Sequence, residues 1–407
     1  MNEMRQSLTI FLLIILCFNA LGQIDIENRF STFGIIAVDR VENNWGCAFA
    51  TNNIAIGQSG VYEIVPGYGI IASIAFTNPE YPIKGVELLK KGVSLELVFD
   101  SISKTDESLY FRQIAMIDSV GNAFGFTGNT IKSFSHAGTL IGDGYVVLGN
   151  SLSNDTVLQA IETGFLNSSD PFYKRLLSAL IAGQDAGGQL TGKLSASICV
   201  KKFGQTGFNE VDYRVDLSKT PFKDLQNLIN KKSGISLLRK ANKTEDKDSA
   251  LYLLNNASIL LKDWAMLYPE ISKSYYRNGY EARAVNLLAE RLETDSLFIG
   301  FLPSCYFLRS NERYQDLINE LEFGIHEWLE AIYSLIDFEL NKEAIEISIN
   351  LIDKYKESSY LHYLIGKAYL NLEDNKKANR YYQLALQLDS ENNEAKNALD
   401  ELNNNNR

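Results

Sequence analysis

This chain of 407 residues contains few of the side chains that bind metals, with only three histidines and four cysteines. The histidines are scattered, and no two cysteines have the Cys-x-x-Cys spacing of a zinc site. Because a structural zinc ion needs a cluster of such ligands, we expect no metal site, and we expect no other cofactor. The sequence also lacks the Gly-x-Ser-x-Gly motif of many serine hydrolases, so a serine–histidine–aspartate triad is not expected.

Blocks of basic residues are absent too. The chain has 39 lysine and arginine residues against 50 aspartate and glutamate residues, for a formal net charge of −11. A nucleic-acid partner needs a basic surface that neutralises phosphates, and we therefore expect none. The excess of acidic residues contributes to solubility.

The apolar run near the N-terminus, residues 8–18, is shorter than the roughly 20 residues that a membrane span needs. It follows Arg5 and precedes the small residues of Ala20-Leu21-Gly22. That order is typical of a secretion signal. We expect a signal peptide at residues 1–22, no stable membrane span, and a secreted or periplasmic protein.

Removal of this segment would leave three cysteines. An odd number argues against a framework of disulfides. Two of the three, Cys47 and Cys199, lie in apolar runs that have the pattern of strands. We expect both as buried thiols.

The composition and the hydrophobic pattern of the sequence change near residue 235. Before it, short runs rich in β-branched and aromatic residues alternate with turns that contain glycine. These runs predict strands at 30–38, 45–51, 68–76, 112–117, 123–127, 145–150, 195–201 and 213–216, with helices at 84–91, 94–103, 155–166 and 173–181. Strands and helices each come in consecutive pairs, which favours antiparallel sheets covered by helix pairs. We expect an α+β domain at residues 24–232, built as a four-layer αββα sandwich.

Beyond residue 235 the strand pattern ends and a 34-residue helical repeat emerges. In its last copy Gly366 and Ala368 lie on one expected helix, and Ala378, Tyr382 and Ala385 lie on the next. This pattern resembles the tetratricopeptide repeat, in which small residues let two helices pack closely. Because one repeat cannot bury its apolar face alone, residues 240–402 are expected to form an α-helical array. Such an array typically binds a protein or peptide partner, although these helices could instead only cover the first domain.

A set of short segments carries a resemblance over the first half of the chain. They are residues 32–39, 75–81, 85–89, 126–128, 144–150, 182–188 and 213–216. In order and spacing they resemble family 1028 of the domains of unknown function. The resemblance implies an N-terminal-nucleophile-hydrolase-like fold. The activity of that family is undefined, and hydrolysis of amide bonds or of peptidoglycan has been suggested for it.

The resemblance makes Thr32 the candidate nucleophile. In this fold the first residue of the mature chain attacks an amide carbonyl, and its own α-amine takes the hydroxyl proton. Cleavage after Gly22 would leave residues 23–31 attached, so activity would require scission between Ser31 and Thr32. In the alternative interpretation, Thr32 is a β-branched residue that only begins a strand.

Two further residues are candidates for a catalytic role. Asn78 precedes Pro79, which favours an extended or turn conformation, and its amide either donates to a substrate carbonyl or forms an Asx turn. Asp216 lies two residues after Arg214 on one face of an expected strand. The pair either takes part in the site or forms an internal ion pair that orients the sheet.

The remaining candidates would bind substrate. Tyr81 lies in the loop of Asn78 and would form a wall of the pocket. Thr127 and Asn150 each end an expected strand, where they either line a cleft or belong to turns. Arg214 is the fourth candidate for binding substrate.

The chain also departs from the pattern of the family. Ile74 stands in place of a glutamine, Gln189 in place of an acidic residue, Thr191 and Leu194 in place of an arginine and a glutamine, and residues 217–219 lack a histidine. Loss of donors would weaken stabilisation of developing charge. Two hypotheses follow: an exported amide-bond hydrolase of the N-terminal-nucleophile type, with repeats for protein partners and cell-wall peptide as substrate, or a catalytically inactive binding or scaffold protein on the same fold.

Overall fold

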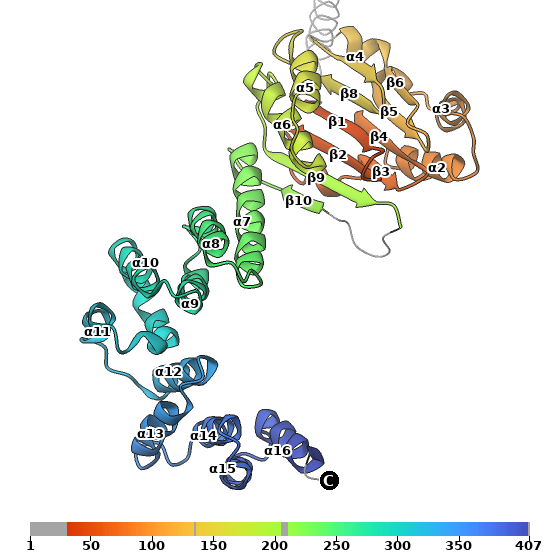
Figure 1. Ribbon diagram of the computed structural model, residues 1–407. Helices are drawn as coiled ribbons and strands as arrows, with labels where there is room; N and C mark the ends of the chain where they lie inside the picture. Colours follow the sequence, from red (N-terminus) through yellow and green to blue (C-terminus); the bar gives the residue numbers. More distant parts are fainter. Residues whose placement is uncertain (1–30, 134–135, 205–210, 406–407) are drawn as a thin grey trace, which may run out of the picture. The chain divides into compact units, whose positions relative to one another are not determined.

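The computed structural model describes residues 31–133, 136–204 and 211–405 (Figure 1). The signal peptide expected at residues 1–22 lies outside these residues. The chain divides into two compact units, residues 1–229 and residues 230–407. The division falls inside helix α7 (Pro221–Ala241), which runs through the border between the two expected domains.

The first unit contains two antiparallel sheets. The six-stranded sheet has the order β10-β9-β2-β1-β8-β7, and the four-stranded sheet has the order β3-β4-β5-β6. The strands of the first sheet are β1 (Thr32–Asp39), β2 (Asn44–Thr51), β7 (Gly138–Gly142), β8 (Tyr145–Asn150), β9 (Ser195–Lys202) and β10 (Val211–Val215). Those of the second are β3 (Tyr62–Val65), β4 (Gly69–Ala75), β5 (Arg112–Asp118) and β6 (Ala123–Thr127).

Successive side chains of a strand point to opposite faces of its sheet. In the first unit this gives three apolar layers: one between the two sheets and one between each sheet and its helix pair. On β1, Phe33 and Ile35 pack against the helix pair α5 (Val157–Leu166) and α6 (Phe172–Asp185), while Ile36 faces the four-stranded sheet. The outer face of that sheet packs against α2 (Glu80–Leu89) and α3 (Leu95–Ser103). Figure 1 shows both helix pairs on the outside of the sheets. The predicted four-layer αββα sandwich is confirmed.

Short elements complete this unit: η2 (Ile56–Gln58), η3 (Leu109–Phe111) and α4 (Asn129–Ser133). Cys47 and Cys199 lie opposite each other on β2 and β9. Both are free and buried, as expected, and burial raises the pKa of both thiols.

The second unit is helical throughout its described residues. After α7 its elements are α8 (Lys247–Leu261), η4 (Ala265–Leu267), α9 (Tyr268–Arg277), α10 (Glu281–Thr294), η5 (Ser296–Leu308), α11 (Glu312–Ile318), α12 (Ile325–Asp337), α13 (Asn341–Ile352), α14 (Ser359–Asn371), α15 (Asn375–Leu388) and α16 (Asn393–Asn405). None of the helices in the described part of the chain is long and apolar enough to cross a membrane.

The helix pairs of the second unit confirm the predicted repeat. Gly366 in α14 lies so close to α15 that an added Cβ would be 2.6 Å from Cδ1 of Tyr382, so only glycine permits this approach. Glu339 and Glu373 are 34 residues apart, and each has a φ of 61°. Each follows the end of the first helix of a pair, so the turn recurs with the period of the repeat.

Candidate functional site

A row of polar residues crosses one end of the six-stranded sheet. Ser195, Thr51, Thr32 and Asn150 are neighbours on β9, β2, β1 and β8. Thr32 lies two positions from Gly34 and four from Ile36, so its side chain points to the same inter-sheet face as Ile36. All four polar residues are buried, with Thr32 6% exposed and Asn150 fully enclosed. The apolar layer between the sheets therefore ends in a polar cluster.

Gln113 on β5 connects this row to the second sheet. Its Nε2 donates to Oγ1 of Thr127 (3.1 Å) and to the carbonyl oxygen of Gly149 (2.9 Å), and its Oε1 accepts a hydrogen bond from Nδ2 of Asn150 (2.8 Å). Two of the predicted substrate-binding residues, Thr127 and Asn150, are thus brought together. Ile74, on β4, is paired with Gln113 of β5 and is fully buried. An apolar side chain therefore borders the polar cluster on this side.

Thr32 makes two hydrogen bonds within the polar row. Its backbone N–H donates to Oδ1 of Asn150 (3.2 Å), and its hydroxyl donates to Oγ1 of Thr51 (3.0 Å). The nitrogen of Thr32 is the atom that would become the α-amine after scission. Asn150 therefore already holds that nitrogen.

The carbonyl group that precedes Thr32 has two donors. The oxygen of Ser31 accepts from Oγ1 of Thr51 (2.8 Å) and from the backbone N–H of Asn52 (3.2 Å). Two donors on one carbonyl oxygen are the arrangement that stabilises an oxyanion. The hydroxyl of Thr51 thus contacts both the candidate nucleophile and the carbonyl of the bond that must be cut.

Several residues at this end of the sandwich have a strained backbone with positive φ. Ala55, Ala75, His136 and Ser151 all have φ between 47° and 67°, a region that costs an L-residue about 1–3 kcal/mol. Ala75 and Ser151 directly follow Ile74 and Asn150 of the cluster. Ala55 lies in the loop held by Ser195, and His136 stands two residues before Gly138, whose carbonyl accepts from Gln113. Such strain is typical of functional sites.

Tyr81 belongs to a separate buried cluster. Its hydroxyl donates to Oδ2 of Asp106 (2.5 Å), and Nε of Arg112 donates to the same oxygen (2.7 Å). The hydrogen bonds from Arg112 lower the pKa of Asp106 to about 2, and burial, followed by the bond to Asp106, raises the pKa of Tyr81. Arg112 also donates to the carbonyl oxygen of Phe76. This cluster anchors the loop after β4, and Tyr81 is 3% exposed, so it is no open pocket wall.

Asn78 forms the Asx turn that was its alternative interpretation. Its Oδ1 accepts from the backbone N–H of Glu80 (3.1 Å), at the start of α2. The structure uses this side chain to begin a helix. It does not bring Asn78 into the polar row.

Arg214 and Asp216 were interpreted either as part of the site or as an internal ion pair, and the structure pairs Arg214 with a different carboxylate. Nε of Arg214 lies 3.2 Å from Oδ1 of Asp212, two residues earlier. Asp216 lies beyond the end of β10 and is exposed, and its backbone carbonyl accepts from the N–H of Ala55 (2.8 Å). These two residues hold the edge of the sheet and the loop after β2.

Sequence reasoning missed Thr51, Asn52 and Gln113. Gln113 had a usable signal, because it is a polar residue on the strand face on which Ala115 and Ile117 are buried. Thr51 and Asn52 had none, because they act through the pairing of β2 with β1.

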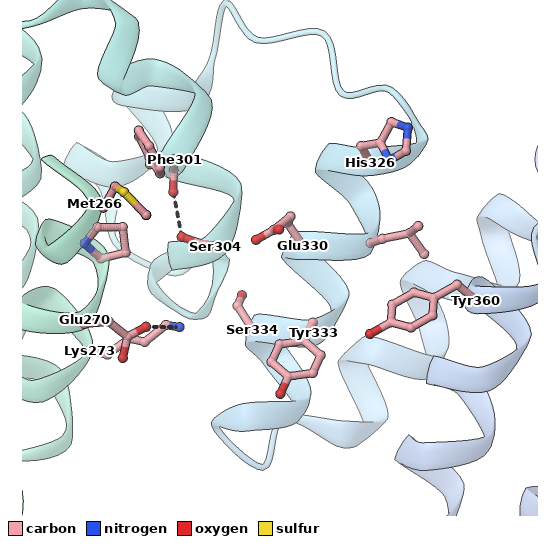
Figure 2. A pocket seen from close by; sticks show the side chains of 12 residues that line it. Met266, Glu270, Lys273, Phe301, Ser304, His326, Glu330, Tyr333, Ser334 and Tyr360 are labelled. Atoms are coloured by element: carbon pink, nitrogen blue, oxygen red, sulfur yellow. Dashed lines mark hydrogen bonds and ion pairs between the residues drawn. The ribbon is translucent and has the colours of Figure 1, made fainter. Parts of the chain in front are cut away.

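The second unit has a groove of about 730 Å³, shown in Figure 2. It is lined by Met266, Pro269, Glu270, Lys273, Phe301, Ser304, His326, Leu329, Glu330, Tyr333, Ser334 and Tyr360. Lys273 pairs with Glu270 at 2.9 Å, whereas Glu330 pairs with no cation of the described residues. Tyr333 and Met266 are exposed, so the groove combines apolar surface with a free carboxylate.

The fold defines a class: an αββα sandwich followed by tetratricopeptide-like helical repeats. Residues 32–225 match the model of the family of unknown function DUF1028. The resemblance stated from the sequence is thereby confirmed for this unit.

Solved structures resemble each part of the chain. A DUF1028 protein from Silicibacter pomeroyi is 29% identical, and the match covers 50% of this chain and 89% of that protein with a TM-score of 0.45. The first TPR domain of human RPAP3 is 15% identical over 34% of this chain and 90% of its own, with a TM-score of 0.20. MamA from Desulfovibrio magneticus RS-1 is 17% identical over 44% of this chain and 85% of its own, with a TM-score of 0.21. None of the curated proteins compared with the chain matches it.

Proposed function

We propose that the first unit is an amide-bond hydrolase whose nucleophile is the hydroxyl of Thr32. One observation carries the proposal: the hydroxyl of Thr51 contacts both Oγ1 of Thr32 (3.0 Å) and the carbonyl oxygen of Ser31 (2.8 Å). The nucleophile and a polarised carbonyl are therefore assembled around the one bond whose scission would free Thr32.

Scission comes first. Oγ1 of Thr32 attacks the carbonyl carbon of Ser31, and Thr51 and Asn52 hold the resulting oxyanion. The C–N bond then breaks, the proton of the Thr32 hydroxyl passes to the nitrogen of Thr32, and the Ser31 acyl group is left as an ester on Oγ1. Water hydrolyses the ester, which releases a Ser31 carboxyl group and a free α-amine next to Oδ1 of Asn150.

Hydrolysis of a substrate amide also proceeds through an ester on Oγ1 of Thr32. The α-amine, with a pKa near 8 in the unperturbed state, accepts the proton of the Thr32 hydroxyl as it attacks a substrate amide. The amine leaving group departs with a proton, and water hydrolyses the acyl–Thr32 ester. Asn150 positions the amine, while Thr51 and Asn52 stabilise the oxyanion.

The substrate that we propose is an amide bond of cell-wall peptide, and the proposed compartment is the periplasm or the cell exterior. The order of charged, apolar and small residues at positions 1–22 supports export. The helical repeats would bind a protein or peptide partner in the groove of Figure 2, whose exposed Tyr333 and Met266 offer apolar contact.

The mature N-terminus tests the proposal. Intact mass and N-terminal sequencing of the purified exported protein should show a chain that begins at Thr32. Thr32→Ala should keep Ser31 and abolish amide hydrolysis, whereas Thr32→Ser, which keeps a hydroxyl, should be cut. A wild-type chain that retains residues 23–31 would contradict the hydrolase and leave a binding protein on this fold.

A further inference from the structure

Ser31 lies in a fully enclosed position directly before the candidate nucleophile. Its exposed fraction is 0%, and its carbonyl accepts a hydrogen bond from the N–H of Asn52, the residue that follows β2. Its Oγ is buried and has no hydrogen-bond partner among residues 31–133, 136–204 and 211–405. A buried hydroxyl without a partner does not stabilise a fold, so the position requires small size and does not require the hydroxyl.

The ester that Ser31 would form on Oγ1 of Thr32 marks the place where a substrate acyl group has to lie. Thr32 and Thr51 are paired on neighbouring strands, and Asn52 directly follows Thr51. A substrate acyl group forms the same kind of ester on Oγ1, with its carbonyl directed to the same two donors. The side chain on the acyl side of the scissile bond then occupies the space that Ser31 fills.

We infer that the enclosed position of Ser31 is the acyl-side pocket of the enzyme and that it selects amides of glycine, alanine and serine. This inference rests on the proposed function. Release of the Ser31 carboxyl group empties the pocket, and a substrate with a side chain of the same size or smaller refills it. A leucine or phenylalanine would have to displace packed neighbours, which interiors resist.

Maturation of Ser31 variants is the first experiment. Full-length Ser31→Ala and Ser31→Gly should be cut before Thr32 at the wild-type rate, as followed by intact mass. Ser31→Phe should be cut at least tenfold more slowly, with Thr32→Ala as the uncut reference. Ser31→Phe that matures at the wild-type rate would overturn the inference and leave the hydrolase standing.

The second experiment needs no substitution, so misfolding cannot affect it. The mature wild-type protein is given the aminomethylcoumarin amides of N-acetylglycine, N-acetylalanine and N-acetylphenylalanine, and release of the coumarin is measured. The glycine and alanine amides should be hydrolysed at least tenfold faster than the phenylalanine amide. Equal rates would overturn the small pocket, whereas a wild-type chain that never matures would overturn the proposed function together with it.

Discussion

Asn150 accepts a hydrogen bond from the backbone N–H of Thr32 at 3.2 Å, and the same side chain donates to Gln113 on the opposite sheet at 2.8 Å. One buried amide thus joins the first residue of β1 to the partner sheet. The contact fixes Thr32 against both sheets at the end where the backbone is strained.

Loss of that amide should destabilise the fold. Asn150→Leu leaves the N–H of Thr32 and Oε1 of Gln113 buried without partners, each at a cost of about 1–3 kcal/mol. We expect the free energy of unfolding to fall by about 3 kcal/mol in urea titrations. In the double variant with Gln113→Leu the loss should be smaller than the sum of the two single losses, because the partners are removed together. Additive losses would mean that the two side chains do not interact.

The hydroxyl of Thr51 should be needed for maturation. Thr51→Val keeps the shape of the side chain but removes the donor to the carbonyl of Ser31 and the acceptor for Thr32. We expect scission to slow by about 10²–10³, the usual cost of one oxyanion donor. Thr51→Ser restores the hydroxyl and should restore scission. Equal rates for valine and serine would remove Thr51 from the mechanism.

The stability of the first unit should depend on pH through Asp106. Arg112 holds the pKa of Asp106 at about 2, below the 3.9 of an unfolded chain. The stabilisation is therefore complete above pH 4 and is lost as the pH falls from about 4 to about 2, with about 2 kcal/mol at stake. Urea titrations at pH 6 and pH 3 check this. The Asp106→Asn variant should be less stable than the wild type at pH 6, and its free energy of unfolding should change less between pH 6 and pH 3.

The groove of the second unit should bind peptides that carry a basic residue. Glu330 and Tyr333 both line this groove from α12 (Figure 2). Lys367 already lies over the ring of Tyr333, with Nζ 4.8 Å from the ring centroid. Glu330 pairs with no cation among the residues that the structure describes, so its carboxylate favours a basic side chain of a bound peptide. Peptides selected from a random library on the full-length protein should lose at least tenfold in affinity with Glu330→Lys. Ile349→Ala removes an exposed apolar residue outside the groove and should have no effect. Peptides without lysine or arginine, or binding that Glu330→Lys leaves unchanged, would contradict the prediction.

Local patterns predicted most of the strands but missed two of them. β3 has only four residues, too few for an alternation to show. β7 begins and ends with glycine, lies at the edge of its sheet and is half-exposed, so it lacks the apolar signal of a buried strand. Pairing with β8 is what makes β7 a strand. Helix α2 begins at Glu80, earlier than its apolar pattern indicated, because the turn of Asn78 starts it.

The structure brings some of the candidate residues together and separates others. Thr32 and Asn150 are paired on neighbouring strands, and Gln113 of the second sheet connects Asn150 to Thr127. Asn78 and Arg214 took local partners, Glu80 and Asp212. A side chain in a turn or at a sheet edge finds a partner a few residues away, and spacing alone does not say on which side.

The order of apolar and polar residues by itself determined the layers of the sandwich, the helical repeats and the position of Thr32 at the start of a strand. Only the tertiary structure placed the hydroxyl of Thr51 between Thr32 and the carbonyl of Ser31. That contact depends on the register of β1 against β2, and a slip of one residue would turn Thr51 to the other face of the sheet. Register is decided by the packing of both faces at once, which no single segment of the chain encodes.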